Sequence, residues 1–286
     1  MVINGRTDLA SEASRLWRQQ AGDTTRLPGV LARQEQLQGL NVTAVQILDE
    51  RGEAALRKAP GQYFTLELPR RCERGAEEFP RAVGAAAELL HRCLGKLSPQ
   101  SVLIAALGNP DITPDAIGPL AASQILVTRH LKQMDPSAFA DYTDTVLLRT
   151  GVLGTTGIES AVQIQSLCQT VRPSCVIAID ALAGADLEGL CRSLQICDTG
   201  IAPGSGVGND RDALTRESLG VPVIAVGVPT VVDAAGFSSD GALGGMFVTP
   251  RNIDSAVRSA SRVIAYGINL ALHPTLQLAD LDMLLG

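Results

Sequence analysis

Three continuous apolar runs constrain the fold of this 286-residue chain more than any other feature of its sequence. They span residues 101–107, 175–179 and 221–226, and they consist almost wholly of Ala, Val, Leu and Ile. Short apolar runs bounded by turn signals are typical of parallel strands that a sheet buries on both faces. We therefore expect a sheet whose central strands have no side that faces solvent.

Helical patterns separate these runs and cover residues 77–94, 116–132, 157–171 and 253–271. Two earlier segments, residues 42–48 and 63–68, alternate between apolar and polar side chains as strands do. Strands that alternate with helices imply crossover connections, which place helices on both faces of a sheet. The sequence predicts an α/β fold, a three-layer αβα sandwich with a mostly parallel sheet.

The first 40 residues differ from the rest because they are polar and follow no strong period. Residues 9–20 could form a short helix, and the Gly and Pro residues of segment 22–28 indicate a loop. We predict an N-terminal arm over residues 1–40 and a single αβα domain over residues 41–286.

Composition disfavours several classes of protein. The formal net charge of −6 argues against a protein that coats DNA or RNA, so we expect no direct nucleic-acid partner. No apolar run reaches the roughly 18 residues that a membrane helix needs, and residues 1–20 lack the apolar core of a signal peptide. The six cysteines include no C-x2-C pair, so we predict buried free thiols in a reducing cytoplasm and no metal ion.

Two aspartates stand where ligands bind in open α/β sheets, beyond the carboxyl ends of the strands. Asp115 lies in the loop after the run 101–107, and Asp180 directly follows the run 175–179. Asp115 could instead favour the dipole of a helix that Thr113 caps. Asp180 could instead cap the next turn, but a carboxylate at the edge of a buried strand is costly unless it is used or paired.

Other motifs that could carry chemistry are weak. The glycine-rich loop around Ser205 lacks the lysine of a phosphate-binding loop and the spacing of a dinucleotide-binding fingerprint. It also lacks the G-x-S-x-G pattern of a serine nucleophile. His130 is the only histidine placed plausibly as a catalytic base, and a structural role on its helix is the simpler interpretation.

Taken in order, segments of the chain resemble the germination proteases of spore-forming bacteria, which degrade small acid-soluble spore proteins. The matching stretches cover most of residues 6–234, with a weaker match over residues 248–272. They include GNPDITPDAIGP (108–119), LVTRHL (126–131), GVLGTTGIES (151–160), IAIDALA (177–183), QICDTGI (195–201), PGSGVGN (203–209) and VPVIAVGVPTVVDA (221–234). No one motif is decisive alone, but nine motifs in the order of the family form a specific signature.

The resemblance implies an αβα fold similar to that of hydrogenase-maturation proteases, and an aspartic-type endopeptidase without a cofactor. The two aspartates implicated in the family fall on Asp115 and Asp180. As a dyad they would share one proton, so that one carboxyl activates water and the other protonates the carbonyl or the leaving amine. Polar residues of the matching segments are candidates for the substrate cleft, namely Asn109, His130, Glu159, Asp198 and Ser205.

The resemblance also implies a zymogen that processes itself. Family substrates are cut after an acidic residue and before a large apolar one, and TDLASE (residues 7–12) fits that description. We therefore predict cleavage between Asp8 and Leu9, so that the arm includes a short propeptide. The implied protein is a homotetramer in the cytoplasm of the spore core, with protein substrates and no membrane partner.

The chain departs from the family pattern in three places. Ala202 stands where the family usually has His, and residues 210–212 (DRD) replace a basic Lys-Arg-Lys. A long insertion common in the family is missing between residues 234 and 248, where the chain has a short Gly/Ser stretch. Two other functions stay open, a metal-dependent endopeptidase of the maturation type and a non-catalytic αβα module that binds spore proteins.

Overall fold

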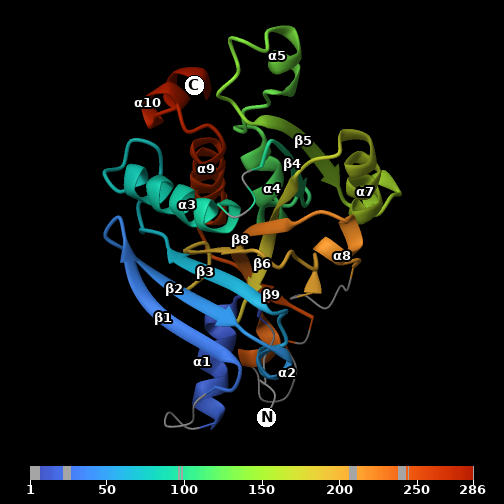
Figure 1. Cartoon of the computed structure of the whole chain (residues 1–286). Helices are drawn as coiled ribbons and strands as arrows, with labels where there is room; N and C mark the ends of the chain where they lie inside the picture. The colour runs from blue at the N-terminus through green and yellow to red at the C-terminus, as the bar shows by residue number, and fades with distance from the viewer. Residues whose placement is uncertain are drawn as a thin grey trace.

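The computed structural model describes residues 7–21, 27–95, 97, 99–205, 211–237, 243 and 245–285. Its strands form one sheet in the order β1-β2-β3-β7-β8-β6-β4-β5, with β9 paired to β8 (Figure 1). The strands are β1 (Val30–Leu37), β2 (Leu40–Ile47), β3 (Gly61–Glu67), β4 (Ser101–Leu107), β5 (Asp144–Gly151), β6 (Cys175–Gly184), β7 (Ser193–Cys197), β8 (Val223–Asp233) and β9 (Phe247–Val248).

The helices are α1 (Ala10–Ala21), α2 (Glu50–Leu56), α3 (Phe79–Leu94), α4 (Ile117–Ala122), α5 (Arg129–Met134), α6 (Leu153–Thr156), α7 (Ser160–Val171), α8 (Arg216–Leu219), α9 (Ile253–Leu272) and α10 (Leu278–Leu285). Short 3-10 turns, η1 (Thr113–Asp115) and η3 (Ala234–Phe237), follow β4 and β8.

The sheet has a parallel half and an antiparallel half. β5, β4, β6 and β8 run parallel to one another. β1, β2, β3 and β7 pair antiparallel, and β7 joins the two halves by pairing antiparallel with β8. The three apolar runs of the sequence lie in β4, β6 and β8 of the parallel half, and these three strands are buried on both faces.

Helices cover both faces of the sheet, which gives three layers (Figure 1). In β4, Val102 and Ile104 pack in one core with residues of α3 and α9, whereas Leu103 and Ala105 pack in another with residues of α7. This division follows from the pleat, which points successive side chains to opposite faces. Residues of α1 and α2 pack on the strands of the antiparallel half. The predicted αβα sandwich is confirmed.

The predicted helix over residues 116–132 is wrong, because the structure has two short helices, α4 and α5, separated by an irregular segment. The buried side chain of Asn269 in α9 explains the break. Its Oδ1 accepts a hydrogen bond from Leu126 N (2.9 Å), and its Nδ2 donates one to Gln124 O (2.8 Å). These bonds satisfy backbone groups that a continuous helix would have paired internally.

β6 and β8 are longer than the apolar runs that predicted them. β6 continues to Gly184, so Asp180 lies within the strand and not after its end. The two strands keep each other's backbone paired beyond the apolar runs, with Asp180 opposite Gly227. β4 stops earlier, and its last pair with β6 joins Ala106 to Ile179. From Asp180 onward, β6 therefore has an edge that β4 leaves free.

Residues 10–21 and 27–37 pack into the domain, although the sequence predicts no strand before residue 42. β1 pairs with β2 along its whole length, so the predicted boundary at residue 40 falls inside a hairpin. β1 escapes detection because it is an edge strand with mostly exposed or half-buried side chains, and its sequence is correspondingly polar. α1 buries Ala10, Ala13 and Trp17 beside α2.

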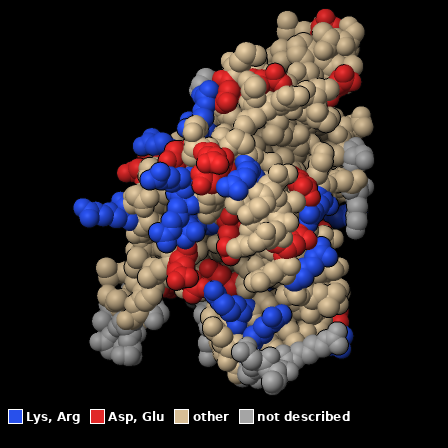
Figure 2. All heavy atoms as spheres, turned by 90° about the vertical axis from the view of Figure 1, so that its left-hand side faces the viewer, with Lys and Arg blue, Asp and Glu red and all other residues tan. Residues whose placement is uncertain are grey.

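The cysteines and the charged surface residues are distributed as the composition of the chain suggests. All six cysteines are buried and free, as predicted. On the face that carries β1 and α3, side chains of Lys and Arg lie intermixed with those of Asp and Glu (Figure 2). Within the described residues, no helix has the length and apolar character required to cross a membrane.

Gly118, in the first turn of α4, lets this helix approach the ends of β4 and β6. A Cβ at this position would lie 2.2 Å from Leu107 O and 2.8 Å from Ile179 O, which are backbone atoms with little freedom to move. We predict that Gly118→Ala lowers the free energy of unfolding by about 1–3 kcal/mol, the usual cost of overpacking. Chemical denaturation followed by circular dichroism measures this change.

Gly84→Ala is the matched control. Gly84 lies inside α3, and a Cβ there would meet only the Gln38 side chain, at 3.7 Å or more. Alanine is favoured over glycine within a helix, so this variant should match the parent or gain up to about 1 kcal/mol. Equal stability of the two variants would contradict the close approach at Gly118.

Candidate active site

Asp115 is held near the end of β4 by the turn that follows this strand. Gly108 has a φ of 107°, and a Cβ there would lie 2.1 Å from Asp115 O, so the turn requires glycine. Asn109 N donates to the backbone oxygen of Asp115 (3.0 Å) and to its Oδ2 (2.9 Å). Thr113 caps nothing, since its hydroxyl bonds to Asp254 instead (2.9 Å). The carboxyl group of Asp115 is thus fixed by the turn and not by a helix end.

Asp180 lies inside β6 and is only 5% exposed. Its Oδ1 accepts a hydrogen bond from Ala181 N (2.9 Å). Because β6 continues through this position, Asp180 caps no turn, and the structural alternative raised by the sequence does not describe it.

Asp115 and Asp180 line the same cavity, which has a volume of about 490 Å³. Its lining also includes Asp8, Leu107, Ile112, Pro114, Val152, Ser160, Leu182, Arg211, Thr230 and Phe247. A mainly apolar pocket with a few converging polar groups is the usual form of an enzyme site. In the part of the chain that the structure describes, no group of three or more His, Cys, Asp or Glu side chains could hold a metal ion.

The cavity perturbs both carboxyl groups. Burial is the main reason that the pKa of Asp180 is raised well above its usual value, and the charges of Asp115 and Asp8 raise this pKa further. Burial also raises the pKa of Asp115, while the hydrogen bond from Asn109 N and the charge of Arg211 oppose that shift. Two acids perturbed to different extents can divide the roles of proton donor and proton acceptor.

The N-terminal segment enters this cavity along the free edge of β6. Asp8 N donates to Ala183 O (2.9 Å), and Ala183 N donates to Asp8 Oδ2 (2.8 Å). Ser205 Oγ donates to Asp8 Oδ1 (3.0 Å). Leu9 is fully buried and is therefore enclosed by the fold, and the half-buried Asp8 lines the cavity of the two aspartates.

Two other side chains, one from β7 and one from the turn after α2, form hydrogen bonds with the same segment. Gln195 of β7 donates from Nε2 to Asp8 O and accepts at Oε1 from Ala10 N, both at 2.8 Å. Lys58 Nζ donates to Thr7 O (3.2 Å). Gln195 and Lys58 line a second, smaller cavity of about 270 Å³. Asp8 lines both this smaller cavity and the cavity of Asp115 and Asp180. The Asp8 residue thus lies between two cavities.

Two of the five residues predicted for the cleft lie at the site. Ser205 contacts Asp8, and Asn109 positions Asp115 through its backbone N–H. The side chain of Asn109 serves its own turn, because its Oδ1 accepts from Asp111 N (3.0 Å).

The structure does not bring the other three to the cavity. His130 is exposed on α5, next to the start of β5 and so at the opposite end of the parallel strands. Glu159 directly precedes α7, and only its neighbour Ser160 lines the cavity. Asp198 is exposed after β7, where its Oδ1 accepts from Gln62 N (2.7 Å).

Arg211 and Gln195 were not among the predicted site residues. Arg211 belongs to the DRD segment, whose sequence indicated only a departure from the family pattern, and its charge acts on both aspartates. Gln195 opens a family-matching segment with no motif of its own. Ala202, the second departure, lines the smaller cavity. Residues 206–210, which include most of the glycine-rich loop, lie outside the described residues, as does most of the Gly/Ser stretch 236–245.

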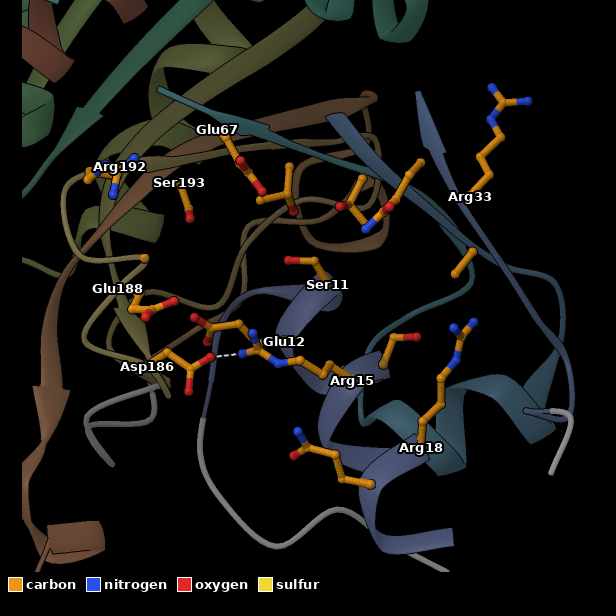
Figure 3. Close-up of a pocket in the computed structure, with 17 residues that line it drawn as sticks. Ser11, Glu12, Arg15, Arg18, Arg33, Glu67, Asp186, Glu188, Arg192 and Ser193 are labelled. Atoms are coloured by element: carbon orange, nitrogen blue, oxygen red, sulfur yellow. Dashed lines mark ion pairs between the residues drawn. The ribbon is translucent and has the colours of Figure 1, made fainter. Parts of the chain in front are cut away.

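A larger hollow of about 790 Å³ lies elsewhere, between α1 and the strands β1 to β3 (Figure 3). Charged residues of both signs line it, and an Arg15–Asp186 ion pair joins α1 to the loop after β6. Neither Asp115 nor Asp180 belongs to its walls. We place the candidate site in the apolar cavity of about 490 Å³, because the perturbed carboxyl groups of Asp115 and Asp180 converge there.

Comparison with known proteins gives one consistent family. The family model described as germination protease matches residues 7–243. A germination protease of Caldanaerobacter subterraneus subsp. tengcongensis is 39% identical over 100% of this chain and 99% of its own length. One from Clostridium perfringens is 35% identical over 100% of both chains, and one from Bacillus cytotoxicus is 42% identical over 82% of this chain and 65% of its own.

Among solved structures, a NiFe hydrogenase maturation protease from Thermococcus kodakarensis aligns with 18% identity and a TM-score of 0.36. The alignment covers 63% of this chain and 98% of that protein.

The raised pKa of Asp180 predicts how stability depends on pH. Ionisation of this buried carboxyl group destabilises the fold. The stability that protonated Asp180 contributes is therefore fully present below the usual pKa of an aspartate, and it is lost as pH rises through the raised pKa. Asp180→Asn cannot ionise and should raise the Tm at pH 7 by at least about 2 °C, the shift that 1 kcal/mol produces at this chain length. Thermal denaturation of the unprocessed chain measures it.

The gain should shrink as pH falls toward about 4, where unfolded aspartate takes up its proton. Asp141→Asn is the control, because Asp141 is exposed and should change stability by less than about 0.5 kcal/mol at any pH. A lower Tm for Asp180→Asn at neutral pH would show that the fold favours the ionised carboxylate.

Proposed function

This chain belongs to the germination protease family, and we propose that it is the endopeptidase that begins the degradation of small acid-soluble, DNA-binding spore proteins during germination. Family membership makes it a peptidase, a hydrolase that acts on protein substrates. It favours neither a metal-dependent maturation-type endopeptidase nor a non-catalytic binding module. The spore-protein substrates, the spore-core location and the homotetramer are parts of the proposal.

One observation carries the proposed chemistry: Asp115 and Asp180 line one cavity, and the pKa of each is raised. This supports an aspartic-type mechanism in which the pair retains one proton. Asp180 is the more strongly perturbed group, so it holds the proton and donates it to the carbonyl oxygen or the leaving amine. Asp115 is then the carboxylate that activates the attacking water. The mechanism uses no cofactor.

The position of the Asp8–Leu9 bond supports a zymogen that cuts itself. Asp8 occupies the cavity of the two aspartates and pairs with the free edge of β6, so it blocks the position of a substrate. Pairing an extended segment with an open strand edge is a common way to bind a peptide. Cleavage after Asp8 would release the propeptide and free that edge for a spore protein, while α1 stays packed.

The departures bear on substrate choice. Ala202 lines the smaller cavity beside Asp8, where a His would add bulk and a possible charge. Arg211 keeps one positive charge near the two aspartates although its neighbours in the DRD segment are acidic.

The shortened domain over residues 41–286 remains a prediction. The alignment with the Caldanaerobacter relative spans 326 positions for 286 residues here, which leaves 40 positions (326 − 286) opposite gaps in this chain.

The dyad predicts that the full chain cleaves itself between Asp8 and Leu9, and that the processed enzyme cuts peptides after an acid and before a large apolar residue. Asp115→Asn and Asp180→Asn should each slow both reactions at least about 100-fold, the lower range of general acid–base contributions. Intact-mass spectrometry measures self-cleavage, and chromatography of a synthetic peptide measures the second reaction.

Asp198→Asn is the matched control, because Asp198 is exposed away from the cavity and asparagine keeps the oxygen that accepts from Gln62 N. It should cut at the parental rate. Folded Asp115 and Asp180 variants that cut as fast as the parent would move the active site elsewhere. A parent that cuts no peptide and leaves Met1 in place would support the binding module instead.

The coupled pair also predicts the direction of the pH dependence. Catalysis needs one retained proton, so the self-cleavage rate should fall as pH rises through the raised pKa of Asp180. The first-order rate constant measured between about pH 4 and 8 should therefore be greatest on the acidic side. A rate that keeps rising to pH 8 would indicate a different base.

A further inference from the structure

The side chain of Gln195 makes two hydrogen bonds that bracket the bond predicted to be cut. Its Nε2 donates to the carbonyl oxygen of Asp8, which is the carbonyl of the Asp8–Leu9 peptide bond, at 2.8 Å. Its Oε1 accepts from Ala10 N, one residue beyond that bond, also at 2.8 Å. Gln195 is 6% exposed, and its bond to Ala10 N is buried while its bond to Asp8 O is partly buried.

Gln195 and Asp180 belong to the same row of the sheet. Asp180 of β6 pairs with Gly227 of β8, and Gly227 pairs with Gln195 of β7. Residues paired in register project from the same face, so the two side chains rise from one face with two strand spacings, about 10 Å, between their Cα atoms. The glycine between them has no side chain. Leu182 packs over it, since a Cβ on Gly227 would lie 2.7 Å from Leu182 Cγ.

The N-terminal segment passes between these two side chains. Asp8 and Leu182 line both the cavity that contains Asp180 and the smaller cavity that contains Gln195. The charge of Asp8 also contributes to the raised pKa of Asp180, which places the two residues within electrostatic reach. The carbonyl oxygen of the Asp8–Leu9 bond thus accepts a hydrogen bond from the Gln195 amide, and Asp8 also lines the cavity of the carboxyl pair.

A fixed N–H donor at a reacting carbonyl has a well-defined effect. As water attacks, negative charge develops on the carbonyl oxygen, and a donor held in place in a dry site stabilises that charge without reorganisation. The amide of Gln195 cannot titrate, and its orientation is fixed because Oε1 is already bonded to Ala10 N. Its donor therefore stays in place over the whole pH range in which the two aspartates titrate.

We propose that Gln195 is a third catalytic residue, whose Nε2–H binds and polarises the carbonyl group of the peptide bond that is cut. The bond to Ala10 N holds the amide in the orientation that aims this donor. The proposal rests on the proposed function, because it takes Asp8–Leu9 as the bond that the two aspartates hydrolyse. When the propeptide leaves, Nε2 becomes free for the carbonyl of a protein substrate, while Oε1 can stay on Ala10.

The test measures the first-order self-cleavage rate of the full chain in mild acid by intact mass. Gln195→Met has a side chain of similar length and no donor, and it should self-cleave at least about 100-fold more slowly, as the loss of one oxyanion donor does elsewhere. Thr65→Val is the matched control. Thr65 pairs with Gln195 across β3 and β7, is buried, and has no hydrogen-bond partner for its hydroxyl among the described residues. It should self-cleave at the parental rate.

Gln195→Glu separates catalysis from positioning. An ionised Glu keeps an acceptor for Ala10 N but lacks the donor, whereas a protonated Glu regains an O–H donor. The ratio of its rate to the parental rate should therefore rise as pH falls. If the contact to Ala10 alone mattered, this variant would match the parent at every pH, which would overturn the proposal.

The remaining outcomes are also decisive. A folded Gln195→Met chain that self-cleaves within about threefold of the parent would overturn the role of Gln195, while the dyad would stand if Asp180→Asn remained inactive. If Gln195→Met fails to fold, the pH-dependent ratio of Gln195→Glu decides the question. A parent that does not cleave after Asp8 would remove the premise and count against the proposed function itself.

Discussion

The burial of Asp180 in one cavity with the half-buried Asp115, where β6 extends past the end of β4, is the constraint on which the rest of the site depends. A buried carboxylate is costly, and a second carboxyl group nearby makes ionisation costlier still, so the pair favours a state in which one group keeps its proton. β6 and β8 carry Asp180 past the end of β4, and the Gly108 turn returns Asp115 to the same place. Gly118 lets α4 approach the ends of β4 and β6 closely. The fold thus stabilises the protonated state of Asp180, which is the state that acid catalysis needs.

The same geometry would allow the N-terminal segment both to inhibit the proposed protease and to be cut by it. Where β4 ends, β6 offers unpaired backbone groups, and an exposed strand edge readily accepts another segment. Asp8 takes that place and adds a carboxyl group near the two aspartates, which raises the pKa of Asp180 further. In the proposed zymogen, binding of the propeptide and protonation of Asp180 are therefore linked. Release of the propeptide would remove one acid from the cavity and expose the edge to substrate.

The sequence predicts those features of the fold that depend on neighbouring residues, and it misses those that depend on contacts between distant segments. The run 101–107 coincides with β4, because a strand buried on both faces must be apolar along its length. Asp180 interrupts the next run, so the extension of β6 through it could not be seen, since it depends on pairing with β8. β1 was hidden for the opposite reason, as an edge strand with a polar sequence. Asp115 and Asp180 were singled out by their positions after apolar runs and by the family resemblance, and their catalytic role stays a prediction. The contact from Gln195 to Asp8 joins residues 187 positions apart, and no local pattern announces it.

We propose that each chain holds its own Asp8–Leu9 bond in its own active site. The most direct measurement mixes the parent with an isotopically labelled Asp180→Asn chain and follows both N-termini by intact mass. Because Leu9 is fully buried, the labelled bond is shielded from other molecules. We expect that the parent processes itself at a rate independent of concentration while the labelled chain stays intact. Cleavage of the labelled chain at a comparable rate, increasing with parent concentration, would contradict it.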